Sequence, residues 1–89
     1  MKITIEFFGT ARYDYGLPSV ELNWPNQEMN LGKLWERLQD QFPHTTSGLR
    51  SSAAPPYLVN LDGQRFITDP ATPIQAGQHV LIMSPDAGG

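Results

Sequence analysis

The chain has 89 residues, enough for one domain, and its hydrophobic content of 39% suits a globular fold rather than a disordered one. Only 6 residues are Lys or Arg and the net charge is −3, which excludes the basic surface that a nucleic-acid-binding protein needs. The chain contains no cysteine, so a disulfide framework, a thiolate metal site and a cysteine nucleophile are excluded. No segment is apolar for long enough to span a membrane, and we expect a cytoplasmic protein.

The N-terminal segment predicts two strands joined as an antiparallel hairpin. Residues 2–8 alternate between apolar and polar positions, the two-residue period of a strand with one buried face. Phe8 breaks this alternation because it places an aromatic ring on the polar face. Gly9 ends the first strand and residues 15–18 have turn composition, whereas residues 20–24 alternate again and predict the second strand.

One helix is predicted in the middle of the chain. Asn30 is the expected N-cap, and Pro43 marks the end of the helix. The apolar positions recur with the 3.6-residue period of one helix face, and both tryptophans, Trp24 and Trp35, are expected in the core. The stripe consists of Leu31, Leu34, Trp35, Leu38 and Phe42. We found no second helix with a comparable pattern.

The C-terminal half predicts three further strands and a tail. Residues 44–56 have the composition of a long surface loop, residues 57–61 form a strand, and Asp62-Gly63 favours a hairpin into residues 64–66. Residues 69–77 are rich in turn formers and residues 79–83 form the last strand. Residues 1–84 are therefore expected to form the domain and residues 85–89 a mobile tail.

This order of elements favours a β-grasp fold of the α+β class. The single helix must cover one face of a mixed sheet of four to five strands in order to bury its apolar stripe. The first and last strands are the most apolar, which suits central positions in the sheet.

Three stretches of the sequence are similar to the MoaD/ThiS family of ubiquitin-like sulfur carriers, and most similar to the small subunit of molybdopterin synthase. They are residues 7–12, with the sequence Phe-Phe-Gly-Thr-Ala-Arg, the pair Val59-Asn60, and residues 69–80 together with the terminal Gly88-Gly89. The chain departs from the family at Gln78-His79, where two acidic residues are usual, and at residues 84–86, where the family has Pro-Pro.

The resemblance implies that the chemistry takes place at the C-terminal carboxylate of Gly89. In the family, an E1-like enzyme (MoeB/ThiF-like) adenylates this carboxylate with Mg-ATP, and sulfur then displaces AMP to leave a thiocarboxylate. Gly88 and Gly89 suit this chemistry because residues without a side chain can enter a narrow channel. The resemblance implies no bound cofactor and no catalysis by the chain alone. It would act as the sulfur-donating small subunit beside a MoaE-like large subunit of molybdopterin synthase.

A carrier must also dock on its partners. Phe8, Leu81 and Met83 are apolar at positions that one helix cannot cover, which predicts an apolar docking surface. Arg12 and Pro85 are further partner contacts implied by the resemblance. The two histidines, His44 and His79, lack neighbouring carboxylates at a ligand spacing, so no metal site is predicted.

Other functions remain open at this stage. The chain could carry sulfur for cysteine, thiolated tRNA or thiazole synthesis. It could also be a ubiquitin-like modifier whose tail is joined to lysines of target proteins. A third possibility is an interaction module whose Gly-Gly terminus has no chemistry. Deleting the tail separates the third function from the others, and lysine-linked adducts identify the second.

Overall fold

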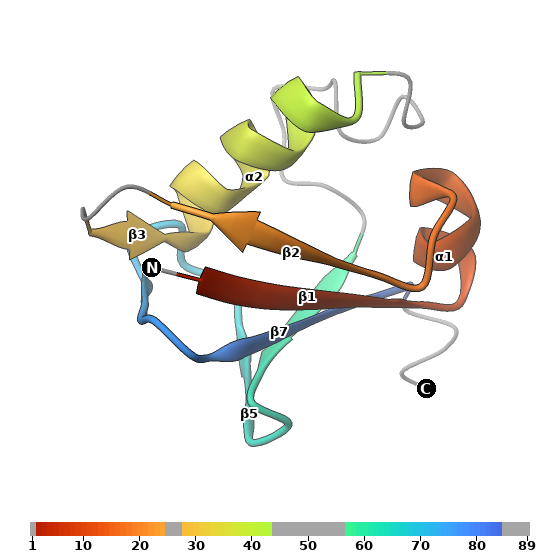
Figure 1. Ribbon diagram of the computed structural model, residues 1–89. Helices are drawn as coiled ribbons and strands as arrows, with labels where there is room; N and C mark the ends of the chain where they lie inside the picture. Colours follow the sequence, from red (N-terminus) through yellow and green to blue (C-terminus); the bar gives the residue numbers. More distant parts are fainter. Residues whose placement is uncertain (1, 25–27, 44–56, 85–89) are drawn as a thin grey trace.

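The computed structural model describes residues 2–24, 28–43 and 57–84 of the chain (Figure 1). Its helices and strands follow one another in the order β1 (Lys2–Phe8), α1 (Thr10–Tyr15), β2 (Ser19–Asn23), β3 (Met29–Asn30), α2 (Leu31–Gln41), β4 (Leu58–Leu61), β5 (Arg65–Ile67), β6 (Pro73–Ile74) and β7 (His79–Met83). In this part of the chain, no helix is both long and apolar enough to cross a bilayer.

The main sheet has five strands in the order β2-β1-β7-β4-β5. The two central strands, β1 and β7, pair in parallel, and every other neighbouring pair in this sheet is antiparallel. The short strands β3 and β6 pair with each other in a separate ladder. Helix α2 lies across one face of the main sheet (Figure 1). The prediction of a mixed sheet with central first and last strands and one main helix is therefore confirmed.

The core lies between α2 and the inner face of the sheet. Alternate residues of each strand point inward, as a two-residue period requires, and the buried helix residues recur every three or four positions. The largest wholly buried side chains include Ile3, Ile5 and Phe7 of β1, Leu34 and Leu38 of α2, and Val80 and Ile82 of β7. Trp24 and Trp35, predicted as core residues, are only partly buried and pack against its margin.

Helix α2 begins as its sequence predicts. Asn30 has an extended backbone, with φ −139°, and its side-chain Oδ1 accepts a hydrogen bond of 2.8 Å from the backbone N of Lys33. This bond satisfies one of the free amides of the first helical turn. The helix ends at Phe42, whose backbone N donates to the carbonyl of Leu38 at 2.8 Å.

A short helix, α1, occupies the connection between β1 and β2, where we predicted only turns. It buries only two residues, Ala11 and Tyr15. Two apolar positions are too few to show the 3.6-residue period by which a helix is recognised in a sequence. Gly16 closes the helix in the left-handed conformation, with φ 80°. The predicted hairpin pairing of β1 with β2 is confirmed, but its connection is helical rather than a simple turn.

The hairpin between β4 and β5 is confirmed at the predicted turn. Asp62 and Gly63 both have positive φ values, 59° and 71°, and the backbone N of Gln64 donates to the carbonyl of Leu61 at 3.0 Å. The register pairs Leu61 with Arg65, so three residues, 62–64, connect the two strands. Asp62 tolerates this conformation better than most residues with a side chain. The turn directs β5 back along the edge of the sheet.

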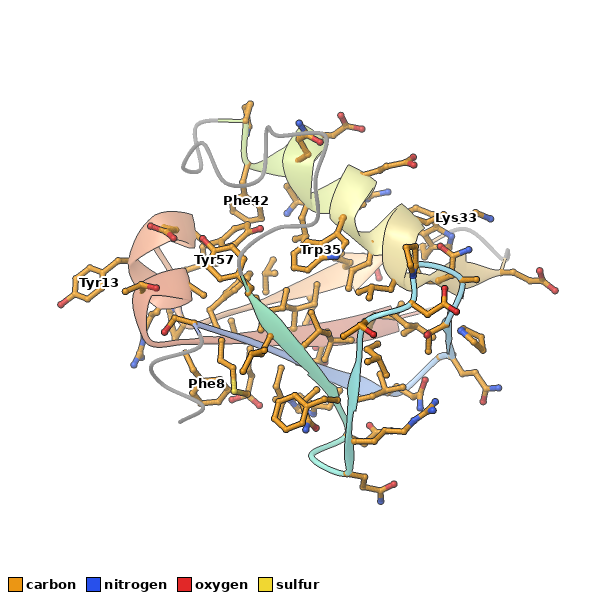
Figure 2. All side chains as sticks on the ribbon, turned by 180° about the vertical axis from the view of Figure 1, so that it is seen from behind. Phe8, Tyr13, Lys33, Trp35, Phe42 and Tyr57 are labelled. Atoms are coloured by element: carbon orange, nitrogen blue, oxygen red, sulfur yellow. The ribbon has the colours of Figure 1, made fainter. Side chains whose placement is uncertain are left out.

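Tyr15 lies in an aromatic cluster that joins α1 to the rest of the fold. Its ring stacks on Phe7 with centroids 4.3 Å apart and meets Phe42 edge-on at 5.3 Å. Tyr57, which donates a hydrogen bond to Asp14, lies beside it and close to Trp35 (Figure 2). The Tyr15 hydroxyl is buried without a hydrogen-bond partner in the described part of the chain. Burial, followed by the nearby Tyr57 and Asp14, raises the pKa of Tyr15 well above its usual range.

This pKa shift predicts an alkaline loss of stability that Tyr15→Phe removes. The folded state keeps a proton that the unfolded state releases above about pH 10, so the associated stability is complete below that pH and is lost as the pH rises further. Phenylalanine also removes an unpaired buried hydroxyl, so we expect an equal or higher free energy of unfolding at neutral pH. Urea unfolding at about pH 8 and about pH 11 measures both effects.

The matched control is Tyr13→Phe, because Tyr13 is 88% exposed and points away from the molecule (Figure 2). This control should lose stability above about pH 10 as the original chain does. A Tyr15→Phe variant that lost just as much stability at high pH would contradict the assignment to Tyr15.

Candidate functional site

The outer face of the sheet, opposite α2, carries an apolar surface. The register places Phe8 of β1 beside Met83 of β7, and Met83 beside Leu58 of β4. In the next row, Leu81 of β7 lies beside Asn60 of β4, and Asn60 lies beside Phe66 of β5. Residues directly opposite each other on neighbouring strands project from the same face. We call Phe8, Leu58, Phe66, Leu81 and Met83 the outer-face patch.

The exposure of these side chains agrees with their position. Phe8 is 40% exposed and Phe66 56% exposed, while Leu58, Leu81 and Met83 are half-buried. Figure 2 shows Phe8 on the side of the sheet that faces away from α2. By contrast, Val80 and Ile82, the alternate residues of β7, are fully buried on the inner face. The structure therefore brings the predicted residues Phe8, Leu81 and Met83 together on one surface.

Sequence reasoning missed two members of the outer-face patch, Leu58 and Phe66. Leu58 has the opposite strand parity to the buried Val59 and Leu61, and this alternation was the available signal. Phe66 follows the Asp62-Gly63 turn closely, but only the pairing of β5 with β4 shows that it lies beside Asn60. The position of β4 next to β7 could not be derived from local patterns.

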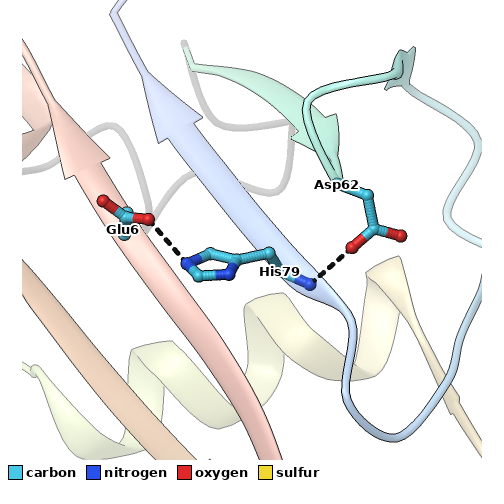
Figure 3. Close-up of polar contacts among 3 residues, drawn as sticks. All are labelled: Glu6, Asp62 and His79. Carbon is cyan, nitrogen blue, oxygen red and sulfur yellow. Dashed lines mark hydrogen bonds and ion pairs between the residues drawn. The ribbon is translucent and has the colours of Figure 1, made fainter.

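A cluster of polar side chains, Glu6, Asp62 and His79, borders the outer-face patch at the start of β7 (Figure 3). Nε2 of His79 lies 2.6 Å from Oε1 of Glu6 on β1. The backbone N of His79 donates to Oδ1 of Asp62 at 2.8 Å, and the Gln78 side chain donates to Oδ2 of Asp62 at 2.9 Å. Asp62 thus ties the β4–β5 turn to β7. The border carries two carboxylates that a basic partner group could approach.

His79 contacts a carboxylate on the neighbouring strand. Among the described residues, no group of three or more histidine and acidic side chains is arranged to hold a metal ion. His44, the other histidine, lies outside the described residues. The contact of His79 with Glu6 instead joins the two central strands on the outer face.

The end of β7 lies beside the start of α1. Ser84, the last described residue, is buried, and its Oγ accepts a hydrogen bond of 3.4 Å from the backbone N of Thr10. Because Phe8 and Met83 are direct neighbours, the two central strands end together. The chain therefore continues toward its terminal residues from a point beside the outer-face patch.

Of the remaining predicted site residues, the structure describes Arg12. Arg12 is exposed on α1, where it lines a shallow groove together with Gly9, Tyr13, Gly16, Leu17 and Pro18. The structure does not place Arg12 among the patch residues. Pro85, Gly88 and Gly89 lie outside the described residues.

Comparison with known proteins identifies the fold. No protein-family model matches the chain, and no curated protein matches it. Solved structures do match over most or all of their length. Two crystal structures of SAMP1 from Haloferax volcanii match with TM-scores of 0.78 and 0.74. The first of them is 16% identical to this chain, and the match covers 100% of both chains.

Two further structures support the same assignment. A chain of the complex of subunits 1 and 2 of molybdopterin-converting factor from Helicobacter pylori is 20% identical, with a TM-score of 0.64 and 100% coverage of both chains. The HVO 2177 protein of Haloferax volcanii is 23% identical, with a TM-score of 0.74, and the match covers 100% of this chain and 87% of that one. The structural neighbours are thus molybdopterin-converting-factor and small archaeal modifier proteins, and the chain shares their β-grasp fold.

Proposed function

We propose that this chain is a ubiquitin-like sulfur carrier whose Gly89 carboxylate is converted to a thiocarboxylate. The observation that carries the proposal is the path of β7. Leu81 and Met83 of this strand belong to the outer-face patch, and the same strand leads through Ser84 to the terminal glycines. A protein that binds the patch is therefore next to the segment on which it must act.

The proposed chemistry takes place in two steps on the activating enzyme. A carboxylate is a poor electrophile, so an E1-like enzyme of the MoeB/ThiF type first joins the Gly89 carboxylate to AMP, with release of pyrophosphate from Mg-ATP. Sulfide then attacks the acyl carbon and displaces AMP, which leaves with one of the original carboxylate oxygens. If the donor is a persulfide of a partner protein, its outer sulfur attacks in the same way to form an acyl disulfide. A second thiol of the partner then cleaves the S–S bond, which releases the thiocarboxylate and leaves a disulfide on the partner. The chain has no cysteine, so the sulfur must come from another molecule.

Molybdopterin synthesis is the proposed destination of the sulfur. The neighbour from Helicobacter pylori was solved as a complex of subunits 1 and 2 of molybdopterin-converting factor, which favours a large subunit of the MoaE type as a partner. In this proposal, the tail enters the large subunit, which supplies the catalytic groups. The exchange would take place in the cytoplasm, where Mg-ATP is available.

Protein modification is the second candidate. SAMP1 is named a small archaeal modifier protein, and its fold matches this chain over the full length. The same activated Gly89 could then form an isopeptide bond with a lysine of a target protein. Lysine-linked adducts distinguish this function from sulfur transfer to a small molecule.

The first experiment is an intact mass measurement. The protein is incubated with Mg-ATP, a sulfur donor and the E1-like enzyme of its host. We expect a mass gain equal to the replacement of one oxygen by sulfur, and no gain when ATP is left out. An unchanged mass with an enzyme that activates its own known carrier would contradict the proposed function.

A further inference from the structure

Asn60 is the one polar residue at the centre of the outer-face patch. It lies on β4 directly between Leu81 of β7 and Phe66 of β5. Despite its place on the outer face, only 8% of Asn60 is exposed. Its carbonyl oxygen Oδ1 has essentially no contact with solvent and accepts no hydrogen bond from any residue that the structure describes.

Such a carbonyl is costly to keep in a free protein. Most buried polar atoms have a hydrogen-bond partner, because leaving one unpaired sacrifices the hydrogen bonds it would make with water. Two neighbouring side chains on this face do have polar contacts: Nε2 of His79 lies 2.6 Å from Oε1 of Glu6, and the exposed Asp62 accepts two hydrogen bonds. In this row Glu6 lies on the outer side of Leu81, at the border of the patch, whereas Asn60 lies between two apolar neighbours, Leu81 and Phe66. An apolar residue would fill the position of Asn60 without this cost.

We propose that Asn60 is a specificity determinant that receives a hydrogen bond from the E1-like adenylating enzyme docked on the outer-face patch. The inference rests on the proposed function, because it concerns the protein that must bind beside the tail. It gives the partner surface a defined chemistry: apolar side chains that cover Leu81 and Met83, with one N–H or O–H donor directed at Asn60. A wholly apolar partner would leave the carbonyl unpaired and would therefore be disfavoured.

Phe66 is the side chain that can open the route to Asn60. An oxygen without solvent contact can be reached only if a neighbour moves, and Phe66 is 56% exposed on a strand of three residues at the edge of the sheet. No strand of the described sheet lies beyond β5 to hold its ring in place. In the proposed complex, the Phe66 ring moves away from Asn60 so that the donor of the partner can reach Oδ1.

The test replaces Asn60 with leucine, which has nearly the same size and no hydrogen-bonding atom. We expect the unfolding midpoint of Asn60→Leu in urea to be equal to or higher than that of the original chain. We also expect its Kd for the E1-like adenylating enzyme to rise about tenfold or more. Asn60→Ala removes the same oxygen without adding apolar surface, and the same loss of affinity is expected for it.

Thr4→Leu is the matched control, because Thr4 lies on the same face, beside His79, outside the patch. It adds the same apolar surface and should leave the Kd unchanged. A lower unfolding midpoint for Asn60→Leu would overturn the proposed role of Asn60. So would two Asn60 variants that bind the E1-like enzyme with the Kd of the original chain. Neither outcome would contradict the proposed function. If the unaltered chain neither binds the enzyme nor gains sulfur, the proposed function fails and the partner contact of Asn60 fails with it.

Discussion

Replacing Gly89 with valine is expected to abolish the gain of sulfur while leaving the fold intact. The terminal carboxylate must reach the α-phosphate of ATP in the enzyme, and a β-branched side chain next to it would displace the reacting carbon. A misplacement of about 1 Å can cost about a hundredfold in rate, so we expect a loss of at least that size. Intact mass after a fixed incubation with Mg-ATP, sulfur donor and E1-like enzyme measures the effect.

Ala87→Val is the control for the Gly89 variant. It places the same side chain in the same tail, two residues away from the carboxylate. We expect this variant to gain sulfur at a rate much closer to that of the original chain. Sulfur gain by Gly89→Val at the original rate would show that the terminal residue does not enter a confined channel.

Aspartate at two neighbouring positions of β7 is expected to have opposite effects on folding and docking. Leu81 belongs to the outer-face patch, whereas Ile82 is wholly buried between the sheet and α2. A charge at Leu81 remains in contact with water in the free protein but must be buried when a partner docks. We therefore expect Leu81→Asp to fold normally and to bind the E1-like enzyme at least about a hundredfold more weakly.

Ile82→Asp buries a charge without a partner in the core. The cost of more than about 4 kcal/mol is a large part of the 5–15 kcal/mol that stabilises a typical domain. We expect this variant to be largely unfolded by circular dichroism. Normal binding by Leu81→Asp would remove the outer-face patch from the docking surface, and a stable Ile82→Asp would contradict the position of β7 in the core.

The patterns of apolar and polar residues in the sequence predicted most of the fold correctly. Alternation in β1 predicted which of its residues are buried, and the stripe of α2 predicted which face it presents to the sheet. Helix α1 was missed because two buried residues, Ala11 and Tyr15, make too short a pattern. Trp24 and Trp35 were predicted to be core residues but are only partly buried. Periodicity predicts the direction in which a side chain points, but it does not predict how much of that side chain the neighbouring elements cover.

The candidate site was only partly predictable. Phe8 was identified because it violated the alternation of its own strand, and Leu81 and Met83 because β7 is apolar on both faces. Leu58, Phe66 and Asn60 join the same surface only through the pairing of β4 with β7 and of β4 with β5. Pairing between strands that are distant in the sequence depends on the whole chain, so no local pattern could reveal it.

The parallel pairing of β1 with β7 also bears on when the protein can fold during synthesis. The strand β1 is made long before β7 and must wait for it before the centre of the sheet can form. Contacts this distant in the chain slow folding, because a long loop must close before they contribute. A nascent chain that still lacks β7 has neither the complete core nor Leu81 and Met83 on its surface. The central strands and the outer-face patch are therefore complete only after β7 has been added.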